Sequence, residues 1–354
     1  MNNASPNAAL SDVVDIIGLN YQGEGMGTST SGSWPNFRSK FPNKMLWSSE
    51  SSSALSSRGT YVFPVTSGNS ATVGGNSGGN DKAMYVSSYD LYAPSWGSSP
   101  DKVFAAQDKY SYVAGEFVWT GWDYIGEPTP YDKSRSSYFG IIDLAGFKKD
   151  RFYLYQSRWR SDFPMAHILP HWTWPDRVGQ VTPVHVYSSG DEAELFVNGK
   201  SAGRIKKGQY EYRFRWDKVT YEAGEVRVVT YKNGKEWATD MKKTVGSAAK
   251  LNVTADRTAI SGDVLSFVSV AVVDKNGDSV PQASNAITFS ISGPGKIVST
   301  DNGDPTDMTA FPSLTRKAFS GYALAIVRAT GSGKITVSAA ADGLTGGQVT
   351  LEGS

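Results

Sequence analysis

The pattern of apolar and polar positions divides the chain into three zones. Up to about residue 160, short apolar runs alternate with polar stretches compatible with helices. The run at 13–19 is continuous and rich in β-branched residues, which is typical of a strand buried on both faces, and further short runs follow at 45–47 and 116–119. Before the third run, Ser-Pro-Asp at 99–101 supplies an N-cap, a first-turn proline and a first-turn acid. Strand–helix–strand alternation of this kind predicts a parallel α/β sheet.

From about residue 170 the pattern changes to short alternating runs, which are typical of antiparallel strands. Asn198-Gly199 and Asn233-Gly234 lie between such runs and predict type I′ hairpin turns. The sequence GSAAK at 246–250 marks a boundary, after which the all-β pattern repeats. We therefore expect two immunoglobulin-like β-sandwiches in series, at 163–247 and 248–354.

The first zone is too short for a complete barrel. It holds about three strands, whereas a (β/α)₈ barrel needs eight strands and roughly 250 residues. A three-stranded parallel sheet with two apolar faces cannot bury both by itself. We expect residues 1–162 to form the last three-eighths of a TIM barrel, with further chain before Met1 or a partner completing it. The expected fold class is therefore α/β plus all-β.

The stretch 66–81 is rich in Gly, Ser and Asn and predicts a long surface loop.

The composition of the chain argues against several classes of partner and binding site. The formal charge is +1, which gives no indication of a nucleic acid, an anionic membrane or a polyacidic partner. The chain has no Cys and only three His, so disulfides and thiolate sites are excluded and no metal site or cofactor is expected. No apolar run is long enough to predict a membrane span. Ten Trp, 18 Tyr and 15 Phe suit a sugar-binding protein, and they suit β-sandwiches equally well.

The candidate chemistry lies where the three predicted strands end. Glu50 closely follows the second run, and a carboxylate at the carboxyl end of a barrel strand lies where barrel active sites are built. Side chains suited to binding a sugar or a carboxylate follow the other two runs, and we expect all of them on one face. They are Asn20, Tyr21, Trp119, Trp122, Asp123 and Tyr124. Arg58 lies in the loop after Glu50, where an exposed arginine is the simplest expectation.

Ordered blocks of the sequence support a specific assignment. They read DIIGLNYQ, MLWSSESSSALSSRGTY, GEFVWTGWDYIGEPTPY and SSYFGIIDLAGFKKDRFYLYQSRW, followed by HILPHWTWPDRVGQVTPVHVY and DNGDPTD. The chain resembles the C-terminal portion of glycoside hydrolase family 2 enzymes of the β-galactosidase type, from barrel strand six onward. The resemblance implies that Glu50 is the catalytic nucleophile, that Tyr21 hydrogen-bonds it, and that Trp119 lies under the sugar. It also implies hydrolysis of terminal β-galactosides with retention of configuration.

The same resemblance implies a second carboxylate that this sequence does not supply. A retaining glycosidase needs a general acid/base about 5–5.5 Å from its nucleophile. In this family it belongs to an Asn-Glu pair at the end of strand four, and no such pair occurs here. Glu116 is predicted at the start of its strand on the wrong face, and Glu24 and Glu127 in loops. We therefore expect the chain alone to be inactive or nearly so, with the missing N-terminal part of the barrel needed for activity.

Two other classes of function stay open. One is a non-catalytic carbohydrate-binding or scaffold protein derived from such an enzyme. The other is a related β-mannosidase or β-glucuronidase, although the tripeptide at 198–200 is predicted to be a hairpin rather than the Asn-x-Lys signature of β-glucuronidases. The resemblance further implies a periplasmic or secreted protein, with no signal peptide in this sequence. Aspartates in the turns of the last zone are expected to be turn residues rather than Ca²⁺ ligands.

Overall fold

Three parallel strands form the N-terminal sheet, in the order β1-β2-β7. They are β1 (Ile16–Asn20), β2 (Met45–Ser52) and β7 (Val113–Trp119). The computed structural model describes residues 8–25 and 32–354. The predicted parallel sheet is present, but β1 starts later than expected because Ala8–Val13 form helix α1. The strand β2 continues past Trp47, since its polar residues still pair with β1.

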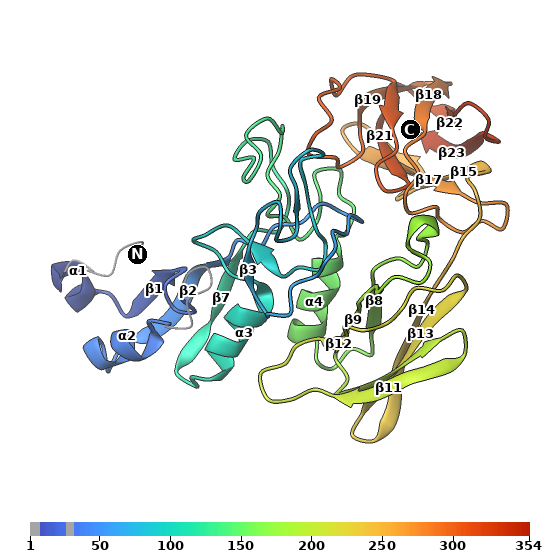
Figure 1. Ribbon diagram of the computed structural model, residues 1–354. Helices are drawn as coiled ribbons and strands as arrows, with labels where there is room; N and C mark the ends of the chain where they lie inside the picture. Colours follow the sequence, from blue (N-terminus) through green and yellow to red (C-terminus); the bar gives the residue numbers. More distant parts are fainter. Residues whose placement is uncertain (1–7, 26–31) are drawn as a thin grey trace. The chain divides into compact units, whose positions relative to one another are not determined.

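Within residues 8–25 and 32–354, helices cover one face of this sheet and leave the other uncovered. Leu19 and Leu46 pack on Trp34 and Phe37 of α2 (Trp34–Lys40), beside α3 (Pro100–Asp108; Figure 1). On the opposite face, Met45 is 53% exposed and Phe117 is 56% exposed. The ring of Trp47 packs edge-on against Phe117 there, at 4.9 Å between centroids. The sheet is therefore apolar on both faces, as the sequence predicts, and one face is open in this chain.

The predicted start of α3 is confirmed by its capping geometry. The Ser99 Oγ atom accepts a hydrogen bond from the Lys102 backbone N–H at 3.3 Å, and Pro100 occupies the first turn. A further helix, α4 (Asp150–Trp159), follows β7 and buries Arg151 and Leu154.

The stretch 66–81 is not wholly a surface loop, because two of its short segments find backbone partners. Four two-residue strands occur between β2 and α3, and Gly79 is buried. They are β3 (Ala71–Thr72), β4 (Gly79–Asn80), β5 (Tyr85–Val86) and β6 (Tyr92–Ala93).

Two antiparallel sheets follow, in the orders β11-β10-β13-β14 and β12-β9-β8. Their strands are β8 (Ala166–Leu169), β9 (Val184–Ser188), β10 (Glu192–Val197), β11 (Lys200–Lys206), β12 (Phe214–Trp216), β13 (Glu225–Lys232) and β14 (Lys235–Lys243), with a 3₁₀ turn η1 (Pro175–Arg177). Val186, Leu195 and Val228 from both sheets share one buried core. The turn at Asn198 and Gly199 has φ values of 48° and 78°, so the predicted type I′ hairpin is confirmed.

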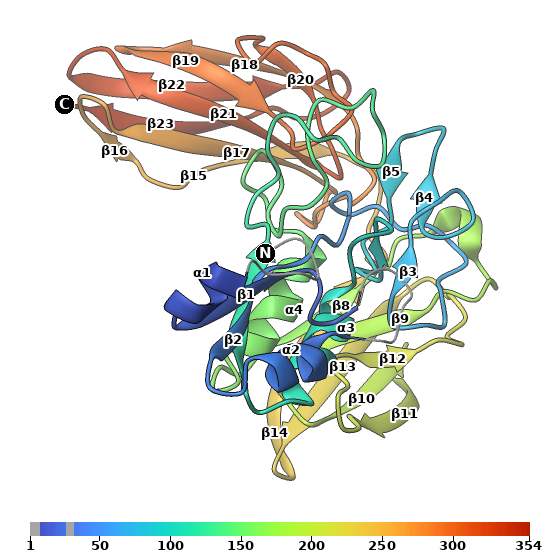
Figure 2. The same ribbon diagram turned by 90° about the vertical axis from the view of Figure 1, so that its left-hand side faces the viewer.

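The last part of the chain is a second pair of sheets, drawn in orange to red in Figure 2. One sheet has the order β15-β17-β21-β19 and the other β16-β23-β22-β18-β20. Their bounds are β15 (Lys250–Ala255), β16 (Ala259–Ile260), β17 (Leu265–Val273), β18 (Ala286–Ser292), β19 (Gly295–Asp301), β20 (Thr315–Lys317), β21 (Tyr322–Ala329), β22 (Gly333–Ala340) and β23 (Gly347–Gly353). Val270, Phe289 and Val337 belong to the core between the two sheets.

The chain separates into two compact units. One holds the parallel sheet and the first pair of antiparallel sheets, up to Lys243. The other holds the second pair from Thr244 onward, together with Asp143–Phe147. Inside the first unit, Arg213 before β12 donates from Nε to Asp101 Oδ1 of α3 at 2.9 Å. This buried ion pair joins the sandwich to the helix layer of the parallel sheet.

Candidate functional site

The strand register brings Asn20 and Glu50 together at the carboxyl edge of the parallel sheet. Asn20 pairs with Glu50 across β1 and β2, and the Tyr21 N–H donates to the Glu50 backbone carbonyl at 2.8 Å. On the other side of β2, Ser52 pairs with Trp119 at the end of β7. The register shifts at Asn20 and again between Ser48 and Ser51, so β2 is irregular around Glu50. The side-chain oxygen of Asn20 is buried and has no hydrogen-bond donor among the described residues.

The Tyr21 hydroxyl forms the closest support for Glu50. Its Oη atom lies 2.6 Å from Ser53 Oγ. Burial raises the pKa of this hydroxyl far above its usual range, and its hydrogen bond to Glu50 raises that pKa further. Tyr21 therefore stays protonated at ordinary pH and can donate to a carboxylate at position 50. A hydrogen-bond donor held on a carboxylate favours the charged form, which is the form that a nucleophile needs.

The backbone around Glu50 adopts conformations that side chains other than glycine rarely take. Tyr21 has a φ of 60°, and Ser52 and Ser53 have φ values of 69° and 53°. Each such residue costs on the order of 1 kcal/mol or more, and such strain gathers at functional sites. One of these three residues, Tyr21, follows β1 beside Glu50, and the other two follow Glu50 in the chain. Their strained backbone indicates that the surrounding packing fixes the position of the Glu50 carboxylate.

Aromatic side chains follow the end of β7. Trp119 and Tyr124 meet edge-to-face with 5.7 Å between ring centroids, after a cis peptide bond between Trp119 and Thr120. The Tyr124 hydroxyl donates to the Glu127 carboxylate. Trp122 is 58% exposed, so its ring is open to a ligand. Rings of this kind can stack on the apolar face of a sugar.

Asp123 does not face open space, contrary to the expectation that it contacts the sugar. Its Oδ2 atom lies 2.7 Å from Lys149 Nζ, and its Oδ1 atom accepts from the Gly140 N–H at 2.7 Å. Lys149 also donates to the Ser56 carbonyl at 2.8 Å. Both partners of the ion pair are almost fully buried, because the loops after β2 and β7 close over them. Asp123 and Lys149 therefore hold those two loops together and act as positioning residues.

Arg151 supports the same loop after β2. Arg58, in that loop, is buried, contrary to the expectation that it is exposed. The guanidinium of Arg151 donates to the Ser56 hydroxyl at 3.0 Å and to the Gly140 carbonyl at 2.9 Å. Arg58 is only 7% exposed. A buried arginine on α4 was not predicted, because position 151 reads as part of a charged helix surface. No sequence signal distinguished it, or Lys149, from solvated residues.

Two further carboxylates belong to the part of the chain around the parallel sheet. Glu116 is in the middle of β7 rather than at its start, and its carboxylate accepts from Ser51 Oγ at 2.5 Å. Glu116 precedes Phe117, whose side chain lies on the open face, so strand alternation places Glu116 on the helix-covered face, and burial raises its pKa. Glu24 is buried, and burial raises its pKa to about 7. The burial of Glu24 was not predicted, since it was read as a loop residue.

Within the described residues, no cluster of three or more His, Cys, Asp or Glu side chains could bind a metal ion. The described helices are also all too short or too polar to cross a membrane.

Comparisons with known proteins agree with this architecture. The sequence model of glycoside hydrolase family 2 C-terminal domain 5 matches residues 251–350, and a domain of unknown function, DUF4982, matches residues 179–238. The β-galactosidase BoGH2A of Bacteroides ovatus is 38% identical over 339 residues, which cover 94% of this chain and 38% of that protein. A β-glucuronidase of Formosa agariphila is 29% identical over 191 residues, covering 52% of this chain and 19% of that protein.

A solved structure extends the likeness to three dimensions. The crystal structure of a β-glycosidase from Bacteroides vulgatus matches with a TM-score of 0.82 and 28% identity, over 96% of this chain and 45% of that one. The chain thus spans less than half the length of each of these relatives. The chain belongs to glycoside hydrolase family 2 and carries the C-terminal domain 5 of that family.

Proposed function

We propose that Glu50 is the nucleophile of a retaining β-galactosidase whose remaining barrel strands lie outside this sequence. The observation that carries the proposal is the position of Glu50 at the carboxyl edge of the parallel sheet, where Asn20 pairs with Glu50 and Ser52 pairs with Trp119. Support also comes from the protonated Tyr21 hydroxyl, whose pKa is raised by burial and by Glu50. The sugar would be bound between Glu50 and the aromatic residues that follow β7, with Trp119 under it and Trp122 and Tyr124 beside it.

The reaction has two steps. A Glu50 carboxylate oxygen attacks the anomeric carbon, and the glycosidic bond breaks as its oxygen takes a proton from a general acid. Water then attacks the same carbon, gives its proton to that group, and releases the sugar and the free Glu50 carboxylate. The general acid belongs to a strand outside this sequence in our proposal, since Glu116 alternates with Phe117 of the open face and its carboxylate accepts from Ser51.

The open face of the parallel sheet supports the idea of a completed barrel. Met45 and Phe117 lie exposed on that face, and in the described chain β1 and β7 each have a free edge. Strands six to eight of a (β/α)₈ barrel would have this face inside the barrel. We infer domain bounds of 1–162 for the barrel portion, and 163–247 and 248–354 for two immunoglobulin-like sandwiches. A periplasmic or secreted location is part of the same proposal.

The substrate proposed is a terminal β-galactoside of an oligosaccharide or glycan, because a β-galactosidase matches 94% of the chain. A β-glucuronide is the second candidate, favoured by the relative from Formosa agariphila that is named a β-glucuronidase. A non-catalytic sugar-binding protein is the alternative from a different class.

The test is a substrate panel on the chain joined to the N-terminal barrel strands of a family 2 relative. Aryl β-galactosides, β-glucuronides and β-mannosides are compared at equal concentration. We expect hydrolysis of the galactoside by the completed enzyme, none by the chain alone, and none by the Glu50→Gln variant. Binding of galactose by a completed protein that has no turnover on any of the three substrates would favour the non-catalytic alternative.

A further inference from the structure

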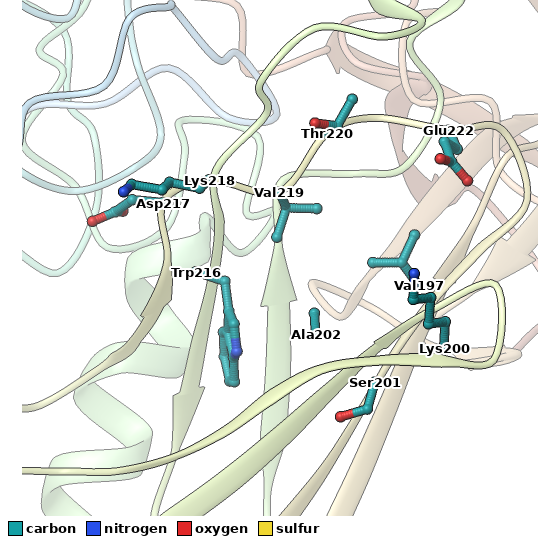
Figure 3. A pocket seen from close by; sticks show the side chains of 10 residues that line it. All are labelled: Val197, Lys200, Ser201, Ala202, Trp216, Asp217, Lys218, Val219, Thr220 and Glu222. Carbon is teal, nitrogen blue, oxygen red and sulfur yellow. The ribbon is translucent and has the colours of Figure 1, made fainter.

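A groove of about 570 Å³ opens at the edge of the first pair of antiparallel sheets (Figure 3). It lies between β11, which is the edge strand of one sheet, and the end of β12, which is the edge strand of the other. The volume falls in the range of small-molecule sites, about 300–1,000 Å³. The region matches a domain to which no function is assigned.

The groove is open because β11 is irregular at this point. The pairing of β10 with β11 shifts between Leu195 and Phe196, so that Ala202 has no partner opposite it. The next residue, Gly203, has a φ of 108° and its carbonyl accepts from Trp216 Nε1 at 3.1 Å. A β-bulge bends its strand and redirects side chains, and bulges are enriched beside binding sites. Here it places Ala202 against the groove and leaves space over Trp216.

The floor of the groove is apolar and fixed. It consists of Val197, Ala202, Trp216 and Val219. Trp216 and Val219 are both buried, and the Val219 carbonyl accepts from the Thr182 N–H at 2.7 Å. The backbone hydrogen bond to Thr182 holds the loop after β12 in place. The floor of the groove is therefore preformed.

The rim of the groove is polar and balanced in charge, and several of its charged side chains make no hydrogen bond or ion pair within the described residues. It consists of Lys200, Ser201, Asp217, Lys218, Thr220 and Glu222. Two lysines face two acids, so the rim has no net charge. Across residues 8–25 and 32–354, no ion pair or hydrogen bond engages the Lys200, Lys218 or Glu222 side chains, whereas Asp217 is anchored by His185 at 3.3 Å. Donors and acceptors that the protein does not use are available to a ligand.

We propose that this groove binds a neutral oligosaccharide as a second, non-catalytic site. Sugars carry many hydroxyl groups around apolar ring faces, which suits an apolar floor under a rim of mixed donors and acceptors. An acidic ligand would meet Asp217 and Glu222, and a basic one would meet Lys200 and Lys218. The proposal rests on the proposed function, because a glycosidase acting on a glycan gains from holding a second stretch of the same chain.

The test uses the whole chain and two oligosaccharides of equal length, one a neutral β-galacto-oligosaccharide and the other made of uronic acids. Calorimetry gives the affinity, and NMR shift mapping gives the place of binding. We expect the Lys218→Ala/Glu222→Ala double variant to bind the neutral sugar at least about tenfold more weakly, since hydrogen bonds to charged groups are lost. The matched control is Lys235→Ala/Glu236→Ala, at the exposed start of β14, which should bind like the unaltered chain.

Glu50→Gln should leave this affinity unchanged, so that loss of hydrolysis in the completed enzyme and loss of groove binding are separate outcomes. Absence of binding to the unaltered chain would overturn the proposal. So would equal binding by the groove variant and its control, or tighter binding of the uronic-acid oligosaccharide than of the neutral one.

Discussion

Lys149 Nζ and Asp123 Oδ2 lie 2.7 Å apart, and each side chain is only 2% exposed. The pair links the loop that follows β7 to the loop that follows β2, because Lys149 also donates to the Ser56 carbonyl. Removing one partner would leave an uncompensated buried charge. The positions of Trp119 and Glu50 thus depend on a contact that neither residue makes itself.

Breaking this pair should strongly destabilise the chain. We expect Asp123→Asn or Lys149→Met to lower the free energy of unfolding by about 3–5 kcal/mol, because one buried charge loses its partner. Urea unfolding followed by circular dichroism measures the change. The control is Asp162→Asn, which breaks the exposed pair with Arg160 and should leave the stability nearly unchanged. Equal effects of the buried and exposed changes would contradict the positioning role.

Loss of the Tyr21 hydroxyl should affect catalysis more than folding. In the completed enzyme, we expect Tyr21→Phe to lower kcat by roughly 10–100-fold, since a hydrogen bond to a charged group contributes about 1.5–3 kcal/mol. The substitution keeps the ring in its buried position, so the circular dichroism spectrum should stay the same. Tyr110→Phe, at the far end of the sheet, is the matched control and should retain full activity. A Tyr21→Phe enzyme with unchanged kcat would remove the proposed role of that hydroxyl.

Glu24 should make the chain less stable as the pH rises. Burial raises its pKa in the folded state from 4.5 to about 7. The folded state therefore binds this proton more tightly than the unfolded state, and the free energy of unfolding falls between about pH 4.5 and pH 7. The loss approaches about 3 kcal/mol above pH 7. Glu24→Gln should flatten this slope and stabilise the chain at pH 8 but not at pH 4. Denaturant unfolding at both pH values measures this change in the free energy of unfolding, with Glu236→Gln as the exposed control. The same dependence on pH in Glu24→Gln and in the unaltered chain would refute the prediction.

The open face of the parallel sheet gives a prediction that differs between the chain and the completed protein. Phe117 is 56% exposed in this chain, so Phe117→Ser should cost little stability and should lower the binding of a hydrophobic dye. In the completed barrel the same ring would be buried, and its loss should cost about 3–5 kcal/mol, as for removal of a core Phe. Val178→Ser, at another exposed position, should cost little in both. A small cost of Phe117→Ser in the completed protein would argue against a barrel interior on this face.

The elements that the sequence predicted well are those with a local physical cause. The N-cap at Ser99, the Asn-Gly hairpins and the parallel strands all follow from residues adjacent in the chain. The ends of β2 and the setting of Glu116 were predicted less well, because Ser48 and Ser49 give no apolar signal while the strand continues through them.

In the candidate site, too, some features could be predicted from the sequence and others could not. Asn20, Tyr21 and Glu50 could be placed on one edge, because parallel strands have their carboxyl ends side by side. The burial of Asp123 with Lys149 could not be predicted, since the two lie 26 positions apart and a pair of adjacent lysines is typical of a solvated turn. The groove beside Trp216 depends on a bulge at Ala202, which local propensity does not specify.

The most direct test of the central claim is to identify the residue that becomes covalently bound to the sugar. The completed enzyme is incubated with a 2-deoxy-2-fluoro-β-galactosyl fluoride, and intact-protein and peptide mass spectrometry locate the adduct. We expect one fluorogalactosyl group per chain, attached to Glu50, and none in the Glu50→Gln variant. An adduct on another carboxylate, or steady turnover of the aryl galactoside by Glu50→Gln, would contradict it.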